Sequence, residues 1–250
     1  MKEILRTDGL SVDYGGNRAL DEVSLSIGEG ELVGLIGPNG AGKTTFIDAL
    51  TGFTTSTGRV ALRGVDLSRE RPHLRARKGL ARTWQSAELY DELTVRENLE
   101  VGAVRPGSGG YWRELFTGRG RGHEPVKRAL DLLELNHLAD DLPDSLTQGQ
   151  RKSVDVARAL AAGGELLCLD EPAAGLDSEE SEELGTRLRS LVDAGSSILL
   201  VDHDMGLVLG VCDRIYVLDL GRLIATGTPD EIRSSEIVID AYLGQEGVPA

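Results

Sequence analysis

Short, mostly apolar runs recur along the chain, and each run is flanked by polar residues or glycine. Four runs cover residues 32–36, 166–169, 197–201 and 214–218. Runs of this length are typical of strands that are buried on both faces of a parallel sheet. A shorter run at residues 223–225 follows a turn and predicts a hairpin with the fourth strand.

Helical periodicity replaces these runs in the middle of the chain. Helix-compatible patterns cover residues 97–104 and 126–135, and a third follows residue 147. Further helices are expected near residues 178–194 and after Gly227, where a proline near the first turn favours a helix start.

The pattern predicts one α/β domain over residues 4–244, with a β-rich N-terminal portion and an inserted α-helical subdomain. Its expected parts are a core of residues 4–86 and 163–230, a helical subdomain of residues 87–162, and a C-terminal helix and tail of residues 231–250.

A glycine-rich loop directly follows the first apolar run and precedes a plausible helix at residues 44–50. The loop consists of Gly37, Pro38, Asn39, Gly40, Ala41, Gly42, Lys43, Thr44 and Thr45. This is the phosphate-binding pattern G-x-x-x-x-G-K-[ST], in which the glycines let backbone N–H groups face an anion. Lys43 would reach the β- and γ-phosphates, and the Thr44 hydroxyl would bind Mg²⁺. The alternative is a glycine-rich turn that matches by chance.

Two carboxylates, Asp170 and Glu171, end the second apolar run. Because ligands of open α/β sheets bind beyond the carboxyl ends of the strands, Asp170 is placed to coordinate Mg²⁺, directly or through water. Glu171 is placed to polarise an attacking water. An exposed acidic turn after a core strand is the alternative interpretation.

A third element, residues 146–152, opens the helix that follows residue 147. Its hydroxyl and glycine at a helix N-terminus could meet an anion. By spacing alone it could equally be a capped helix start.

The order of these elements resembles that of the ATP-binding cassette (ABC) ATPases, which have a P-loop NTPase core. The resemblance covers nearly the whole chain and implies ATP and Mg²⁺ as cofactors. It implies that Tyr14 stacks on adenine, that Gln85 touches Mg²⁺ and the water and senses the membrane partner, and that His203 contacts the γ-phosphate. Residues 146–150 match the LSGGQ signature, which implies that Thr147, Gln148, Gly149 and Gln150 contact ATP bound to an opposite protomer. Asp177 matches the loop that crosses the dimer interface.

Each of these residues also has a simpler interpretation. Tyr14 could be a half-buried strand aromatic, His203 could be structural, and Asp177 could cap the following helix. The signature departs from the family form, since Thr147 replaces serine and Gln148 replaces glycine. Because the hydroxyl and Gly149 are kept, we expect an altered rate more than a lost activity.

A narrower resemblance is to the ATP-binding subunits of branched-chain amino-acid importers. It rests on seven further segments and one residue of the sequence: residues 82–85, 89, 93–95, 97–99, 170–176, 202–205, 213–217 and 241–244. It implies a homo- or heterodimer with a second ATPase subunit, two integral membrane permease subunits, and a solute-binding protein that delivers the substrate. Urea or short-amide importers, lipopolysaccharide exporters and soluble ABC switch proteins remain alternatives.

Composition fits such a subunit. The net charge of −14 and the 4% aromatic content argue against nucleic-acid binding. No apolar stretch approaches the ~20 residues that span a bilayer, and the first residues lack a signal-peptide pattern. Cys168 and Cys212 lie in apolar contexts and are expected to be buried, reduced thiols. We expect a chain that is soluble when isolated and peripheral at the cytoplasmic face of the inner membrane.

Residues 105–125 form the least informative stretch, with many glycines and arginines around Trp112. A variable solvated loop is the main expectation. Contact with a membrane partner through Trp112 and Arg113, or an RNA-binding Arg–Gly tract, are the alternatives.

Overall fold

A six-stranded sheet forms the centre of the computed structural model, which describes residues 2–84, 89–103 and 123–243. The strand order is β11-β10-β4-β9-β8-β7. The strands are β4 (Leu32–Ile36), β7 (Leu80–Arg82), β8 (Leu166–Asp170), β9 (Ser197–Val201), β10 (Arg214–Asp219) and β11 (Arg222–Gly227). All pairs are parallel except β10 with β11, which form the expected hairpin. The strands expected from the apolar runs are therefore confirmed.

Both faces of this sheet are buried, as the uninterrupted apolar runs predict. Alternate residues of each strand enter two different hydrophobic clusters, because successive side chains of a strand point to opposite faces. In β9, for example, Ile198 and Leu200 belong to one cluster, and Leu199 and Val201 to the other.

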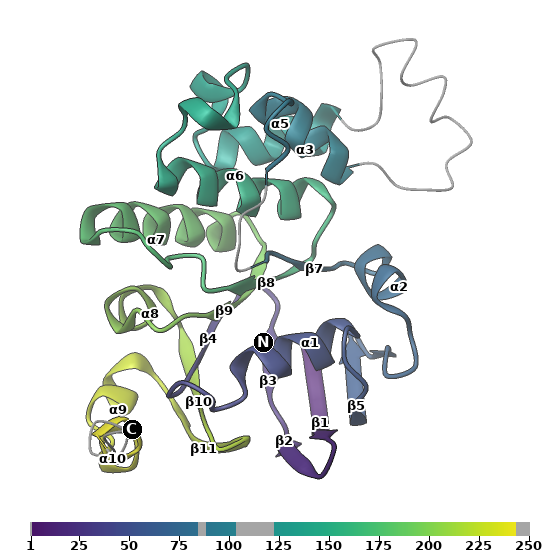
Figure 1. Cartoon of the computed structure of the whole chain (residues 1–250), viewed down its shortest axis with the longest axis vertical. Helices are drawn as coiled ribbons and strands as arrows, with labels where there is room; N and C mark the ends of the chain where they lie inside the picture. Colours follow the sequence, from purple (N-terminus) through teal and green to yellow (C-terminus); the bar gives the residue numbers. More distant parts are fainter. Residues whose placement is uncertain (1, 85–88, 104–122, 244–250) are drawn as a thin grey trace.

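On one face lie helix α1 (Lys43–Thr51) and an antiparallel sheet. That sheet consists of β1 (Glu3–Tyr14), β2 (Asn17–Val23), β3 (Ser26–Gly28), β5 (Thr57–Leu62) and β6 (Val65–Asp66). In Figure 1 this layer occupies the lower right, with α1 beside strands β1 and β5. The expected β-rich N-terminal portion is thus present.

Helices cover the other face. They are α3 (Val95–Ala103), α5 (His123–Leu132), α6 (Gln148–Ala161), α7 (Ser178–Asp193) and α8 (Met205–Val211), with short 3₁₀ turns at Asn136–Leu138 and Pro143–Ser145. Figure 1 shows α3, α5 and α6 grouped at the top, with α7 running between this group and the sheet. Residues inserted between β7 and β8 therefore supply a separate helical layer.

Helix α2 (Pro72–Arg77) lies in the N-terminal portion, where the sequence pattern predicted a helix only at residues 44–50, directly after the phosphate loop. A tertiary contact joins it to α1. The buried Arg75 guanidinium donates to the main-chain oxygens of Ala49 and Leu50 at the end of α1, at 2.9 and 2.7 Å. Carbonyls near a helix C-terminus favour such a cation.

The chain ends in α9 (Pro229–Arg233) and α10 (Glu236–Leu243), at the lower left of Figure 1. Cys168 and Cys212 are both buried and free, as expected. Across the ranges that the structure describes, no helix is long and apolar enough to cross a membrane. Most of the 105–125 stretch lies outside the described residues.

Candidate nucleotide-binding site

The phosphate loop connects the end of β4 to the start of α1, and its glycines are required by its geometry. Gly40 and Gly42 have φ of +78° and +106°, which only glycine adopts readily. A Cβ atom on Gly42 would lie 2.8 Å from the Ala19 oxygen, and one on Gly37 would lie 2.0 Å from the Leu218 oxygen. The loop is therefore packed directly against neighbouring backbone. It leads into the N-terminus of α1, whose N–H groups favour an anion.

Lys43 is the charged centre of the loop. It is buried, and its Nζ atom donates to the main-chain oxygens of Gly37 and Pro38 at 2.7 and 3.1 Å. Burial lowers the pKa of Lys43, while the nearby carboxylates of Glu171, Asp170 and Asp202 oppose that shift. The structure thus brings the loop lysine and the acidic ends of β8 and β9 into one site.

Asp170 ends β8 and is almost fully buried. Its Oδ2 atom accepts from Arg82 at 3.1 Å, whereas its Oδ1 atom is buried and has no hydrogen-bond partner among the described residues. Burial raises the pKa of Asp170, and Arg82 opposes the rise. A buried carboxylate oxygen without a partner is costly unless a further group binds it.

These donors fit Mg²⁺. Within the described residues no group of three or more His, Cys, Asp or Glu side chains forms a metal cage. Mg²⁺ ordinarily binds one or two carboxylates, keeps several waters and takes its other oxygens from phosphates. Asp170 Oδ1, which has no partner among the described residues, and the exposed hydroxyl residue Thr44, in the first turn of α1, supply the protein's share of such a set.

Glu171 has a left-handed backbone, with φ of +50°. That conformation costs a non-glycine residue on the order of 1–2 kcal/mol, and such strain is concentrated at functional sites. Hydrogen bonds from the Glu171 N–H to Val201 O, at 2.7 Å, and from the Ala174 N–H to Glu171 O, at 3.1 Å, hold the turn in place. These bonds fix the backbone position from which the carboxylate projects.

His203 follows β9 and lies 3.9 Å from Glu171, measured between Nδ1 and Oε1. Its side chain is 59% exposed, so it is open to a ligand or a partner. The buried Asp202 organises this turn by accepting the N–H groups of Ala173, His203 and Asp204 at 3.0, 2.8 and 3.0 Å. Sequence reasoning assigned no role to Asp202, although a carboxylate at the end of an apolar strand was the available signal.

The signature segment forms the N-terminus of α6. Thr147 and Gln150 make a capping box, in which Thr147 Oγ1 accepts the Gln150 N–H at 3.2 Å and Gln150 Oε1 accepts the Thr147 N–H at 2.9 Å. The Gly149 N–H donates to Glu180 at 3.3 Å, and Gln148 Nε2 donates to Ala174 O at 3.3 Å. The simpler interpretation, a capped helix start, is therefore confirmed for the single chain.

Asp177 caps α7, as its simpler interpretation predicted. Its Oδ1 atom accepts a hydrogen bond from the Glu180 N–H at 2.9 Å, and the Glu180 carboxylate accepts one from the Asp177 N–H at 3.4 Å. Glu180 therefore serves two helix N-termini at once, because it also binds Gly149 of α6. No pattern in the sequence predicts this second contact.

Tyr14, another expected site residue, makes its side-chain hydrogen bond outside this cluster. Tyr14 is half exposed at the end of β1, and its hydroxyl lies 3.1 Å from Thr54 Oγ1, beyond the C-terminal end of α1. Gln85 lies outside the described residues.

The phenol of Tyr242, on α10, lies near the phosphate loop. Burial raises the pKa of this phenol, and the main chain of Gly37 opposes the rise. Only the resemblance of the C-terminal segment pointed to that residue.

Comparison with known proteins decides the family. The model described as ABC transporter matches residues 20–174. This chain belongs to the ABC transporter family. A second model, described as branched-chain amino acid ATP-binding cassette transporter, matches residues 222–248.

Individual ABC proteins match over almost the full length. The high-affinity branched-chain amino acid transport ATP-binding protein LivG of Salmonella typhimurium is 41% identical, over 97% of this chain and 98% of its own. The lipopolysaccharide export system ATP-binding protein LptB of Escherichia coli K12 is 37% identical, over 97% and 98%. A crystal structure of the ADP conformation of an ABC transporter cassette superimposes with a TM-score of 0.85, at 32% identity, over 98% of this chain and 100% of that one. The α/β P-loop fold and the resemblance to branched-chain importer ATPases are confirmed.

Proposed function

We propose that this chain is the ATP-hydrolysing subunit of an ABC importer for branched-chain or related amino acids. The observation that carries the ATPase assignment is the buried Lys43, which is held in a glycine loop by the main-chain oxygens of Gly37 and Pro38. The carboxylates of Asp170, Glu171 and Asp202 lie close enough to act on its charge. The cargo assignment is supported by the match of residues 222–248 to the branched-chain model and by the likeness to LivG.

In this proposal the loop residues 37–45 bind the phosphates of ATP through backbone N–H groups and Lys43, and Tyr14 stacks on adenine. Thr44, Asp170 and Gln85 would hold Mg²⁺. When bound, Mg²⁺ would offset the charge that develops on the phosphate oxygens.

Glu171 and His203 are the proposed catalytic side chains. Glu171 orients a water for in-line attack on the γ-phosphate, and its pinned turn fixes the carboxylate before the substrate arrives. His203, which is exposed and close to Glu171, donates a hydrogen bond to the γ-phosphate. Gln85 is the third proposed catalytic residue. These groups lie at the carboxyl ends of β8 and β9, where ligands of α/β sheets bind.

A second ATPase subunit, identical or homologous, completes the proposed site. The cassette of residues 4–244 would pair head-to-tail, so that Thr147, Gln148, Gly149 and Gln150 meet ATP on the other protomer and Asp177 lies at the interface. Loss of the γ-phosphate removes the bridge between the two subunits, and this release drives the transport cycle.

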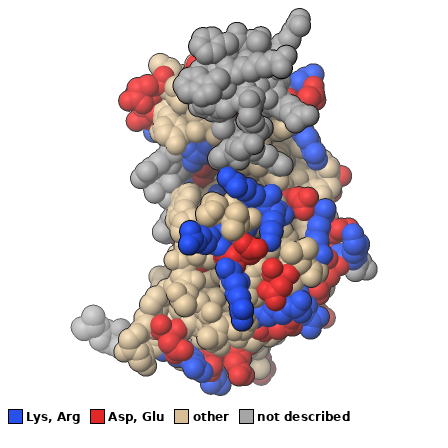
Figure 2. All heavy atoms as spheres, turned by 90° about the vertical axis from the view of Figure 1, so that its right-hand side faces the viewer, with Lys and Arg blue, Asp and Glu red and all other residues tan. Residues whose placement is uncertain are grey.

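The proposed contact with the permease subunits is a pocket of about 980 Å³ between α2 and the helical layer. Exposed apolar side chains line it, among them Phe53, Trp84 and Val101. Figure 2 shows this side of the molecule, where Lys and Arg side chains gather at mid-height although the whole chain carries a charge of −14. Apolar area with a charged rim is typical of a protein interface. We place the chain at the cytoplasmic face of the membrane, beneath permeases that a solute-binding protein supplies.

Uptake of labelled leucine and labelled urea tests the cargo, in cells that carry either the wild-type chain or Glu171→Gln and lack redundant systems. Selective loss of leucine uptake in the variant would support the proposal. Loss of urea uptake alone would keep the mechanism and change the substrate. If neither uptake changed, the importer assignment would be rejected, and the likeness to LptB makes lipopolysaccharide export the next function to test.

A further inference from the structure

Arg82 joins three elements of the nucleotide-binding core. It ends β7, and its side chain is only 7% exposed. One guanidinium nitrogen, Nη2, donates to Asp170 Oδ2 on β8 at 3.1 Å. The other, Nη1, binds Asp48 Oδ1 on α1 and lies 3.5 Å from Thr51 Oγ1. One side chain thus connects the carboxylate proposed to hold Mg²⁺ with the helix that begins at the phosphate loop.

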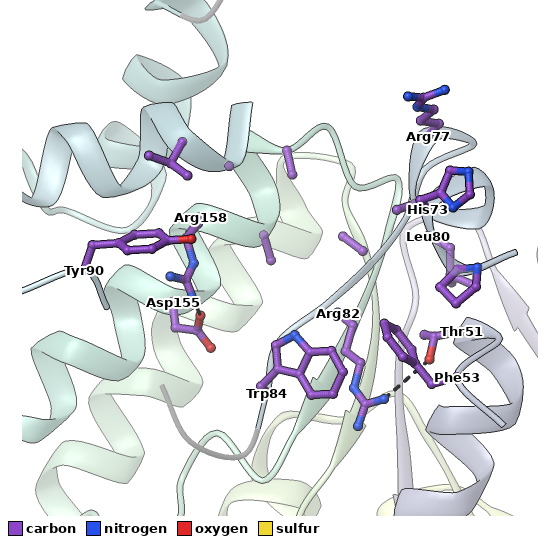
Figure 3. Close-up of a pocket in the computed structure, with 17 residues that line it drawn as sticks. Thr51, Phe53, His73, Arg77, Leu80, Arg82, Trp84, Tyr90, Asp155 and Arg158 are labelled. Atoms are coloured by element: carbon purple, nitrogen blue, oxygen red, sulfur yellow. Dashed lines mark hydrogen bonds and ion pairs between the residues drawn. The ribbon is translucent and has the colours of Figure 1, made fainter. Parts of the chain in front are cut away.

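The same guanidinium also packs against two aromatic rings of the pocket. Its Cζ atom lies 4.3 Å from the centroid of Trp84 and 5.8 Å from that of Phe53. The two rings meet edge to face, with centroids 4.9 Å apart and planes at 79°. Trp84 is 46% exposed and Phe53 is 54% exposed. Figure 3 shows Arg82 between these rings, on the wall of the pocket opposite Tyr90.

We propose that Arg82 is a positioning residue that fixes Asp170 for the metal, and that Trp84 and Phe53 set the place of Arg82. A partner that displaces these rings in the pocket would then alter the metal site without touching it. This inference rests on the proposed function, and it adds the physical link between the pocket and Asp170.

Orientation, and not charge, is the contribution assigned to Arg82. A positive charge beside Asp170 repels a cation, so Coulomb's law alone would make Arg82 weaken metal binding. The planar fork, however, holds Asp170 by Oδ2 and leaves Oδ1 without a partner in the described residues, available to the metal. A lysine has the same charge but no fork, and it cannot bridge Asp48 and Asp170 while stacking on an indole. Arg82→Lys therefore separates orientation from charge.

The test measures how strongly a divalent cation tightens nucleotide binding. Affinity for a non-hydrolysable ATP analogue is measured on the full chain with Mn²⁺ and without divalent cations, and the ratio of the two affinities is compared between variants. Arg82→Lys is expected to reduce this ratio about tenfold, as loss of a residue that orients a metal ligand typically does, with metal-free affinity within about twofold. Trp84→Ala should reduce the ratio in the same direction by several-fold.

Two control variants isolate the proposed link. Trp84→Phe keeps a ring for the guanidinium and should restore most of the ratio. Tyr90→Ala removes another exposed aromatic of the same pocket, on the wall away from Arg82, and should leave the ratio unchanged.

The emission of Trp84 supplies a second readout. The chain has two tryptophans, so Trp112→Phe leaves Trp84 as the sole reporter. Adding Mg²⁺ to the nucleotide-bound protein should change Trp84 emission, and Arg82→Lys should abolish that change.

The outcomes are distinguishable. If the wild-type chain binds no nucleotide, the proposed function fails. If the wild-type chain shows metal-dependent nucleotide binding but Arg82→Lys and Trp84→Ala match it, Arg82 has no positioning role and this inference is overturned. An equal loss in Tyr90→Ala would also overturn the link, because it would make the effect a general disturbance of the pocket.

Discussion

Helices α1 and α6 both begin at glycine-containing motifs, yet their N-termini are built differently. Helix α1 has Gly42 as its N-cap, and within the described part of the chain no side chain caps it, so its first N–H groups are left for another acceptor. Helix α6 has a complete capping box from Thr147 and Gln150, and its Gly149 N–H already binds the Glu180 carboxylate.

The N-terminus of α1 can therefore accept an anion, whereas the N–H groups at the N-terminus of α6 already have hydrogen-bond acceptors within the chain. The first N–H groups of a helix need a partner, and in α1 the proposed phosphates are that partner. In α6 the carboxylate of Glu180 takes a position that a phosphate from another protomer would have to share or displace. We therefore expect α1 to determine nucleotide affinity of the isolated chain, with α6 contributing only when two subunits meet.

The largest predicted effect comes from removing the cation of the α1 site. Lys43→Ala should weaken ATP binding by about 100-fold or more, because the ammonium is buried beside the phosphate position and charge-assisted bonds are strong there. Calorimetric titration of the full chain measures this loss. Lys152→Ala, a change of another buried lysine in α6, is the control and should leave the affinity within a few-fold of wild type. Unchanged affinity in Lys43→Ala would refute the loop assignment.

A smaller effect should distinguish two glycines of the same loop. Gly42→Ala places a Cβ atom 2.8 Å from the Ala19 oxygen at φ of +106°, so it distorts the loop as well as straining it. Gly40→Ala, with φ of +78°, meets nothing within 4 Å. We expect roughly tenfold weaker ATP binding for Gly40→Ala, from strain of about 1–2 kcal/mol, and a distinctly larger loss for Gly42→Ala. Equal affinities would show that backbone packing of the loop does not matter.

The smallest effect belongs to α6. Thr147→Ala should lower the free energy of unfolding by about 1 kcal/mol, because it removes the N-cap, and should leave ATP affinity of the isolated chain unchanged. Gln150→Ala removes the other half of the capping box, and the double variant should cost less than the sum of the two. Chemical denaturation measures the first quantity and titration the second. A loss of nucleotide affinity in Thr147→Ala would contradict the statement that α1, and not α6, determines the nucleotide affinity of the isolated chain.

The sequence predicted the parts of this site that are local, and missed those that depend on distant contacts. The strands β4, β8 and β9 follow from apolar runs, and the loop at Lys43 follows from its spacing. Arg82 is 88 residues from Asp170, and Gly149 is 31 residues from Glu180. Contacts between residues so far apart produce no periodic pattern in the local sequence, so neither pairing could be predicted. Helix α2 was missed for the same reason, since Arg75 stabilises it through the distant end of α1.

The role of Glu171 in hydrolysis is tested by phosphate release and ATP affinity, measured together in the wild-type chain and in Glu171→Gln. We expect the variant to bind ATP within a few-fold of wild type and to release phosphate at least about 100-fold more slowly, because the change removes the group that orients the water and leaves Lys43 and the loop intact. We also expect ATP to hold this variant in a closed dimer. Continued rapid phosphate release from Glu171→Gln would contradict the assignment of Glu171 and the mechanism built on it.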